Sequence, residues 1–250
     1  MQKNCFLILL FLVSVRAESK IFDFKNPSYG AFVGGTYGPS IAQDSAYGGS
    51  GGNGVTYDTK EESNYSAEFG FLASTKKLNF KIYAEYLFPK HLTNITGRSG
   101  STALYNLDSD VSVLIPSVAL EYAIKSTNSW RWLLGGGYGY AMGNMDNKYT
   151  FTSAGTSQTG VSNFEEKSTA TSSMYLAYTS FEFQFTDIAT MMIGAGYRYL
   201  RMNTWSASTG VTGLNGTVAS GSTLTNQDGS NRSINLSGPY AGITFRFYFY

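Results

Sequence analysis

The sequence predicts an all-β protein that folds as an eight-stranded antiparallel transmembrane β-barrel with up-and-down topology. Three observations lead to this fold class. Aromatic and aliphatic residues alternate with polar residues in eight segments, no segment beyond the first 17 residues shows a helical period, and short connections alternate with long ones. The segments also approach the roughly 9 to 11 residues that a tilted strand needs to cross a bilayer.

The first 17 residues have the features of a secretory signal peptide. Lys3 supplies a positive charge, residues 5–15 form a short apolar run, and Ala17 ends a small-residue cleavage motif. The run is shorter than the ~20 residues of a spanning helix. We therefore expect a signal peptide over 1–17, a periplasmic N-terminal segment over 18–27 and an outer-membrane β-barrel over 28–250.

The first four expected strands each carry one apolar row, which faces the lipid in a membrane barrel. They cover residues 28–37, 63–73, 78–88 and 111–124. Their outward rows are Tyr29, Ala31, Val33 and Tyr37; Tyr65, Ala67, Phe69 and Phe71; Leu78, Phe80, Ile82, Ala84, Tyr86 and Phe88; and Leu114, Val118, Leu120, Tyr122 and Ile124. Most of the alternate positions are small or polar, which predicts a polar lumen.

The last four expected strands follow the same rule. They cover residues 130–142, 174–185, a segment that follows the turn at 186–188, and the closing strand at 241–250. Their outward rows are Trp130, Trp132, Leu134, Tyr138 and Tyr140; Tyr175, Ala177, Phe181, Phe183 and Phe185; Met191, Ile193, Ala195, Tyr197 and Tyr199; and Ile243, Phe245, Phe247 and Phe249. In the closing strand Arg246 lies on the opposite face, where it needs water or a partner.

The connections alternate in length. Turns of a few residues lie near Lys76, Thr127 and Asp187, and the long connections cover residues 38–62, 89–110, 143–173 and 201–233. Outer-membrane barrels have short periplasmic turns and longer extracellular loops. We therefore expect four mobile loops at the cell surface.

Charged residues inside the strands fall opposite the apolar rows and are balanced in sign. The eight are Glu68, Lys81, Glu85, Glu121, Arg131, Glu182, Arg198 and Arg246. The interior of an eight-stranded barrel is just wide enough for side chains, so these residues predict a lumen charge network, with Glu121 and Arg131 as one pair across a short turn. A soluble β-barrel or sandwich is the alternative, but it would have to bury eight aromatic-rich rows without helices to cover them.

Aromatic residues gather at both ends of the outward rows. Eight tyrosines lie at the long-loop ends. The short-turn ends carry Trp130, Trp132, Phe183, Phe185, Phe247 and Phe249. Amphipathic aromatic girdles of this kind lie at membrane interfaces.

The strand pattern and the closing Phe-Arg-Phe-Tyr-Phe-Tyr resemble the small outer-membrane barrels of Gram-negative bacteria, the group that includes the OmpA transmembrane domain, OmpX and OmpW. In that group the barrel-assembly machinery reads an aromatic residue at the end of the last strand. The resemblance implies a membrane-assembly terminus at Phe245, Phe247, Phe249 and Tyr250. It also implies outer-membrane lipid or lipopolysaccharide and the assembly machinery as partners. The sequence departs from the pattern because Phe249, not Tyr250, falls on the apolar face.

The composition excludes several classes of site. Without Lys3 and Arg16 the 18 basic residues become 16, against 17 acidic ones, so no basic field for nucleic acid is expected. The single cysteine, Cys5, lies in the signal peptide, and His91 is the single histidine. We therefore expect no metal site, no cofactor and no catalytic residues.

The expected function is a structural and surface-interaction role in the cell outer membrane, through four long loops and an unknown extracellular ligand, with at most a narrow channel. A small-solute or hydrophobic-molecule pore of the OmpW type is the alternative. An enzyme at the outer rim that uses His91, with Asp108 and Asp110 in the same loop, is a third hypothesis.

Overall fold

The structure is a computed structural model, and it describes residues 23–41, 46–47, 55–57, 61–89 and 92–249 of the 250-residue chain. The expected signal peptide at 1–17 lies outside the described residues. None of the helices in the described part of the chain has the length and apolar character of a membrane-spanning helix.

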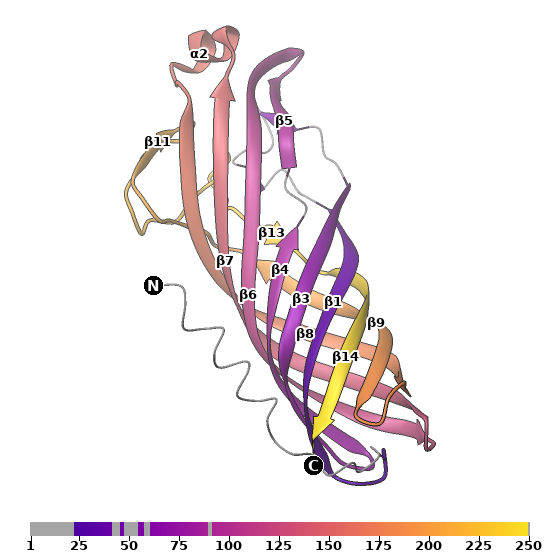
Figure 1. Cartoon of the computed structure of the whole chain (residues 1–250). Helices are drawn as coiled ribbons and strands as arrows, with labels where there is room; N and C mark the ends of the chain where they lie inside the picture. Colours follow the sequence, from indigo (N-terminus) through magenta and orange to yellow (C-terminus); the bar gives the residue numbers. More distant parts are fainter. Residues whose placement is uncertain (1–22, 42–45, 48–54, 58–60, 90–91, 250) are drawn as a thin grey trace, which may run out of the picture.

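Eight strands form a closed antiparallel ring, as predicted (Figure 1). They are β1 (Ser28–Ile41), β3 (Glu61–Ser74), β4 (Leu78–Pro89), β6 (Thr102–Ser126), β7 (Trp130–Phe151), β8 (Phe164–Gln184), β9 (Ala189–Met202) and β14 (Gly238–Phe249). Each ring strand pairs with the one before it, and β1 closes the ring on β14, with Tyr29 opposite Phe249 and Tyr37 opposite Ala241. The order of strands around the wall is therefore the order along the chain.

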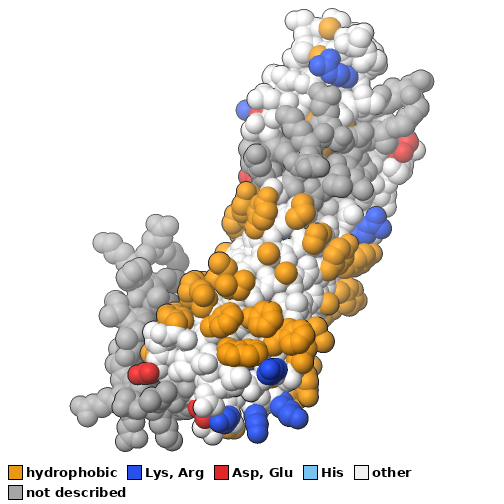
Figure 2. Space-filling model, turned by 90° about the vertical axis from the view of Figure 1, so that its right-hand side faces the viewer, with side chains coloured by type: hydrophobic (Ala, Val, Ile, Leu, Met, Phe, Trp, Pro, Cys, Tyr) orange, Lys and Arg blue, Asp and Glu red, His pale blue; other side chains and the backbone are white. Residues whose placement is uncertain are grey.

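The outside of the ring carries a broad apolar belt (Figure 2). Phe69, Ile82 and Leu134 are each more than half exposed, although burying an apolar side chain of this size is worth about 1.5–3 kcal/mol. Monomeric soluble proteins rarely expose a patch this large, whereas a closed barrel in lipid requires it. The soluble alternative is therefore wrong, and the protein is a transmembrane β-barrel.

The three short turns share one hydrogen-bonding device. Thr75, Thr127 and Thr186 each open a turn, and their Oγ1 atoms accept backbone N–H groups of the next strand at 3.0, 3.1 and 2.9 Å. Threonine is suited to this position because its hydroxyl replaces a backbone partner within the turn. All three predicted short turns are confirmed and lie at the same end of the barrel.

The prediction of residues 89–110 and 143–173 as loops was wrong. β6 begins at Thr102, β7 continues to Phe151, and β8 begins at Phe164, so these three strands rise far above the belt (Figure 1). The smaller elements here are β2 (Thr56–Tyr57), β5 (Leu92–Ser99), α2 (Ser153–Thr159), β10 (Ser206–Ala207), β11 (Val211–Gly213), β12 (Gly216–Val218) and β13 (Ile234–Asn235). We call this part of the protein the head; its described residues are 46–47, 55–57, 92–113, 143–173 and 201–236.

A reversal of polarity explains the error. In the belt the outward residues of β6 are apolar, as at Leu114 and Val118, but above the belt they are polar, as at Asp108 and Asp110. The inward residues change in the opposite sense, because Leu107, like Tyr105 and Val113, is fully buried. Above the belt, side chains still alternate between the two faces of the strand, but the outward ones now face water instead of lipid. A prediction that requires apolar residues to point outward therefore ends the strand too early.

Candidate functional site: the closed lumen

All eight charged residues predicted for the lumen point into the barrel from seven strands of the ring. Seven of them are buried, and Glu68 is partly exposed. Glu121, Arg131, Glu182 and Arg246 have no exposed surface at all. Successive side chains along a strand point to opposite faces, and the residues next to these charges along each strand face the lipid, so the charges face the lumen. Balanced charges at this depth need close partners to offset the loss of hydration.

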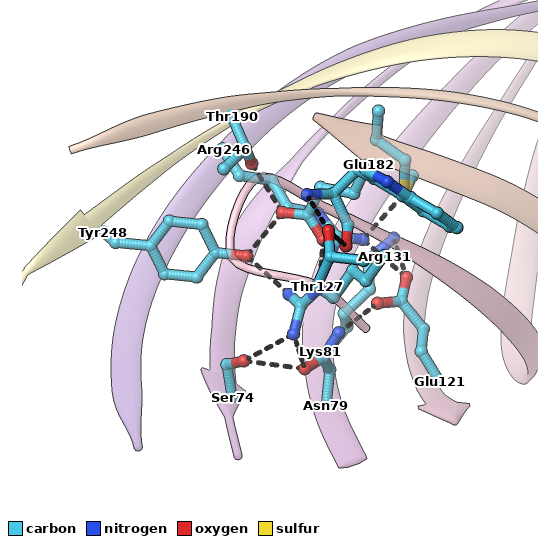
Figure 3. A network of polar contacts seen from close by, with 12 residues as sticks. Ser74, Asn79, Lys81, Glu121, Thr127, Arg131, Glu182, Thr190, Arg246 and Tyr248 are labelled. Atoms are coloured by element: carbon cyan, nitrogen blue, oxygen red, sulfur yellow. Dashed lines mark hydrogen bonds and ion pairs between the residues drawn. The ribbon is translucent and has the colours of Figure 1, made fainter. Parts of the chain in front are cut away.

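Glu182 on β8 is the centre of the lower layer of the lumen (Figure 3). Its Oε2 accepts hydrogen bonds from Nε of Arg131 at 2.6 Å and from Nη1 of Arg246 at 3.1 Å. Its Oε1 accepts the hydroxyls of Thr190, at 2.5 Å, and Tyr248, at 2.7 Å. One buried carboxylate thus joins four side chains from three strands, and both of its oxygens are used.

Glu121 on β6 is the second anchor. Its Oε1 accepts hydrogen bonds from Nη2 of Arg246 at 2.6 Å and from the hydroxyl of Tyr178 at 2.8 Å. Its Oε2 accepts Nδ2 of Asn79 at 2.8 Å, and Nζ of Lys81 lies 3.8 Å from Oε1. Arg246 therefore bridges both buried carboxylates across the lumen.

The predicted pair of Glu121 and Arg131 was wrong. Arg131 lies directly opposite Glu182 in the pairing of β7 with β8, whereas Glu121 lies opposite Gly135 in the pairing of β6 with β7. The pair was predicted from the short distance along the sequence, which takes no account of the stagger between neighbouring strands. Arg131 and Glu121 make no direct contact here but are linked indirectly. Asn79 accepts a hydrogen bond from Nη1 of Arg131 at 3.2 Å and donates one to Glu121, and Glu182 and Arg246 form a second route between them.

A second pair closes the lumen one level higher. Arg198 on β9 forms a buried ion pair with Glu85 on β4. Nearby, Nζ of Lys81 lies 3.9 Å from Oε2 of Glu68 and 4.4 Å from the ring centre of Phe32. A pocket of about 40 Å³ lies among these groups. This volume has room for only a few water molecules.

Gly135 shows how tightly this layer is packed. A Cβ at this position would lie 2.6 Å from Cε2 of Tyr178, closer than real Cβ contacts come. The glycine therefore lets the ring of Tyr178 lie flat against the wall, where its hydroxyl reaches Glu121.

The lower mouth is covered by the segment that precedes β1. Phe24 is 1% exposed, and its ring centre lies 4.7 Å from the guanidinium carbon of Arg131. Phe24 packs with Phe32, Leu72 and Tyr248 in one apolar cluster. Sequence reasoning assigned residues 18–27 only to a periplasmic segment and missed this contact. The aromatic residues Phe22 and Phe24 before the first strand were the available signal.

The upper mouth is filled by an apolar cluster. Trp205 is fully buried and comes from the connection between β9 and β13. Around it in the cluster are Leu87, Ile115, Ala141, Met145, Met174, Leu200, Met202, Leu224, Ile234 and Leu236. Part of the long connection at 201–233 is thus not a mobile loop but a plug, and its isolated apolar residues were the signal that was missed.

Buried polar contacts hold the head together above the plug. The hydroxyls of Tyr57 and Tyr105 lie 2.5 Å apart, those of Tyr57 and Tyr149 donate to the carbonyl of Tyr47, and Arg232 forms a buried ion pair with Glu166. Burial raises the pKa of Tyr105 to about 12, and it raises the pKa of Tyr149 further above its usual range. These tyrosines therefore remain neutral hydrogen-bonding groups over the physiological range.

Two other predicted sites are only partly within view. His91 lies outside the described residues, so the hypothesis of a rim enzyme stays a prediction; Asp108 accepts the backbone N–H of Asn94 at 2.9 Å. Phe245, Phe247 and Phe249 line the outer face of β14, and Tyr250 lies outside the described residues. Their role as an assembly signal also stays a prediction. Within the described ranges, no group of three or more His, Cys, Asp or Glu side chains is placed to hold a metal ion.

Neither the family models nor the curated proteins contain a match to this chain. Among solved structures it is similar to Neisserial surface protein A, with 9% identity over 89% of this chain and 99% of the other, and a TM-score of 0.40. It is similar to OprG from Pseudomonas aeruginosa, with 15% identity, coverage of 90% and 97%, and a TM-score of 0.46. It is also similar to Ail of Yersinia pestis, with 12% identity, coverage of 89% and 99%, and a TM-score of 0.39.

Proposed function

We propose that the protein is a closed outer-membrane barrel with a structural and surface-interaction role, and that it presents its head to an extracellular ligand. The observation that carries this proposal is the filled lumen. Phe24 covers the lower mouth, the arginines and glutamates fill the middle, and the cluster around Trp205 fills the upper mouth. We expect these three layers to block a continuous path for water and ions.

The shape of the head supports the second half of the proposal. Three strands of 25, 22 and 21 residues carry it, about twice the length that crosses a bilayer. Its interior is a packed apolar core, so its outer surface is held in a fixed form. A protein that only anchored a barrel in lipid would not need this rigid extension.

Planar-bilayer recording tests the closed lumen. The wild-type protein is expected to give no reproducible conductance steps. A porin of known conductance, reconstituted in the same bilayers, serves as the control for detection. Reproducible wild-type conductance would overturn the proposal.

A passage for small apolar molecules is a second candidate, favoured by the apolar upper lumen. Met145, Met174 and Met202 lie in the same buried cluster as Trp205, and methionine side chains adapt readily to different partners. Trp205 is one of three tryptophans, so a variant with Trp130→Phe and Trp132→Phe isolates its fluorescence. A saturable emission shift on adding an alkane would support this candidate, and an unchanged spectrum would remove it.

A further inference from the structure

Three lysines lie on two neighbouring short turns at the lower rim of the barrel. Lys76 and Lys77 lie between β3 and β4, Lys125 lies near the end of β6, and all three are exposed. Residues 75–77 and 125–129 include no aspartate or glutamate. Figure 2 shows Lys and Arg side chains gathered below the apolar belt at this end of the protein. We call Lys76, Lys77 and Lys125 the lysine crescent.

The sheet fixes these lysines on one side of the rim. The carbonyl of Lys77 accepts the backbone N–H of Ala123 at 2.8 Å, which ties the first turn to the end of β6. Nζ of Lys125 lies 5.6 Å from the ring centre of Trp130 at the start of β7. The β8–β9 turn, by contrast, carries Asp187 and no lysine.

The charge of the crescent is not neutralised within the described residues, where none of its three lysines forms an ion pair. Directly above it the wall is apolar. Leu78 lies opposite Tyr122 in the strand pairing, and these two residues and Ile124 are each close to half exposed. Cationic groups thus lie against an apolar surface at the level where the belt ends.

We propose that the lysine crescent binds anionic phospholipid headgroups of the membrane leaflet at the short-turn end. A phospholipid places its phosphate level with the turns and its acyl chains along Leu78 and Ile124. A soluble anion would use the lysines but not the apolar wall. Lipopolysaccharide belongs to the opposite leaflet, on the side of the head.

Native mass spectrometry of the full-length protein in detergent tests this, with titrations of phosphatidylglycerol and phosphatidylcholine. In the crescent variant Lys76, Lys77 and Lys125 are replaced by glutamine. The matched control removes the same number of charges from the head, at Lys148, Lys167 and Arg201, which are exposed. Replacement of the crescent by arginines keeps its charge.

The crescent variant is expected to lose its preference for phosphatidylglycerol over phosphatidylcholine by roughly a hundredfold, because three cations near an anionic surface contribute about 1 kcal/mol each and about 1.4 kcal/mol corresponds to a factor of ten. The control and the arginine variant are expected to keep the preference. An unchanged preference in the crescent variant would overturn the proposal, and so would an equal loss in the control, which would indicate net charge alone. Competition by glycerol phosphate as strong as that by the lipid would show a site for soluble anions and would also overturn it.

Discussion

Arg246 on the closing strand and Glu121 on β6 meet across the lumen, with Nη2 2.6 Å from Oε1 and both side chains fully buried. They are 125 residues apart in the chain. β14 pairs with β1 on one side and with β9 on the other, and these pairings place Arg246 in the interior at the level of Glu121. The closing strand therefore contributes both to the closed wall and to the charge network.

Replacement of Arg246 by methionine leaves Glu121 and Glu182 without a shared cation. Removal of one partner from a buried pair costs about 3–5 kcal/mol, so we expect a loss of this size in the free energy of unfolding. Urea unfolding followed by gel mobility of unheated samples measures it. Arg201→Met, at an exposed position of the head, is the control and is expected to change stability little. A loss that is no larger for Arg246→Met would refute the network.

Arg131 is expected to couple with Glu182 rather than with Glu121, because its Nε lies 2.6 Å from Oε2 of Glu182. In a double-mutant cycle, Arg131→Met and Glu182→Gln should be strongly non-additive in their effect on unfolding free energy. The cycle of Arg131→Met with Glu121→Gln should show a smaller coupling. The reverse order of the two couplings would restore the pair expected from the sequence.

Trp205→Ala is expected to destabilise the protein by about 3–5 kcal/mol, because it leaves a large space in the upper plug. It should also expose the connection around it to proteases. Limited proteolysis in detergent, with fragment masses, measures this. Trp132→Ala, whose side chain lies on the lipid face, is the comparison. Equal protection of residues 203–233 in both variants would argue against a packed plug.

Thr127→Ala is expected to destabilise the protein by about 1 kcal/mol, because Oγ1 of Thr127 accepts the N–H of Trp130 at 3.1 Å within the turn. Thr127→Ser keeps the hydroxyl and should restore most of this loss. The urea midpoints of unfolding of the two variants measure this difference in stability. Identical midpoints for alanine and serine would show that the hydroxyl has no role.

The buried tyrosines of the head predict a pH dependence. The pKa of Tyr105 is raised to about 12 by burial, so the folded protein holds this proton more tightly than the unfolded chain, whose tyrosines ionise near pH 10. Its stabilising contribution is complete below pH ~10 and is lost as the pH rises through about 12. Absorbance titration should show one fewer late-ionising tyrosine in Tyr105→Phe than in wild type. No difference between the two titrations would contradict the buried cluster.

The barrel could be predicted from the sequence because lipid requires apolar side chains at every second position of each strand in its wall. Residues 63–73 and 78–88 differ from β3 and β4 by only one or two positions, since Phe69 and Ile82 stand in unbroken apolar rows. The inward direction of the charges follows from the same alternation. Their partners do not, because the stagger between strands decides which carboxylate Arg131 reaches.

The head could not be predicted by that rule. Leu107 and Met145 are apolar and point inward, whereas Asp108 and Asp146 point outward, so the pattern contradicts the lipid rule while the strands continue. Trp205 is an isolated apolar residue in a polar segment, and Phe24 lies in a short segment that has no strand pattern. Their burial depends on contacts with strands far away in the chain, which no local pattern reveals.

Spin-label accessibility along β7 tests the central claim most directly. Single cysteines replace the natural residues at the outward positions Trp132, Leu134, Tyr138, Asn144, Asp146 and Lys148, and at the buried positions Met145 and Tyr149. In lipid vesicles we expect labels up to Tyr138 to be accessible to oxygen, labels from Asn144 onward to a water-soluble nickel complex, and the two buried positions to neither. Rapid, unrestricted motion and equal nickel access at all positions from 144 to 149 would mean that the strands end at the membrane and that the head does not exist.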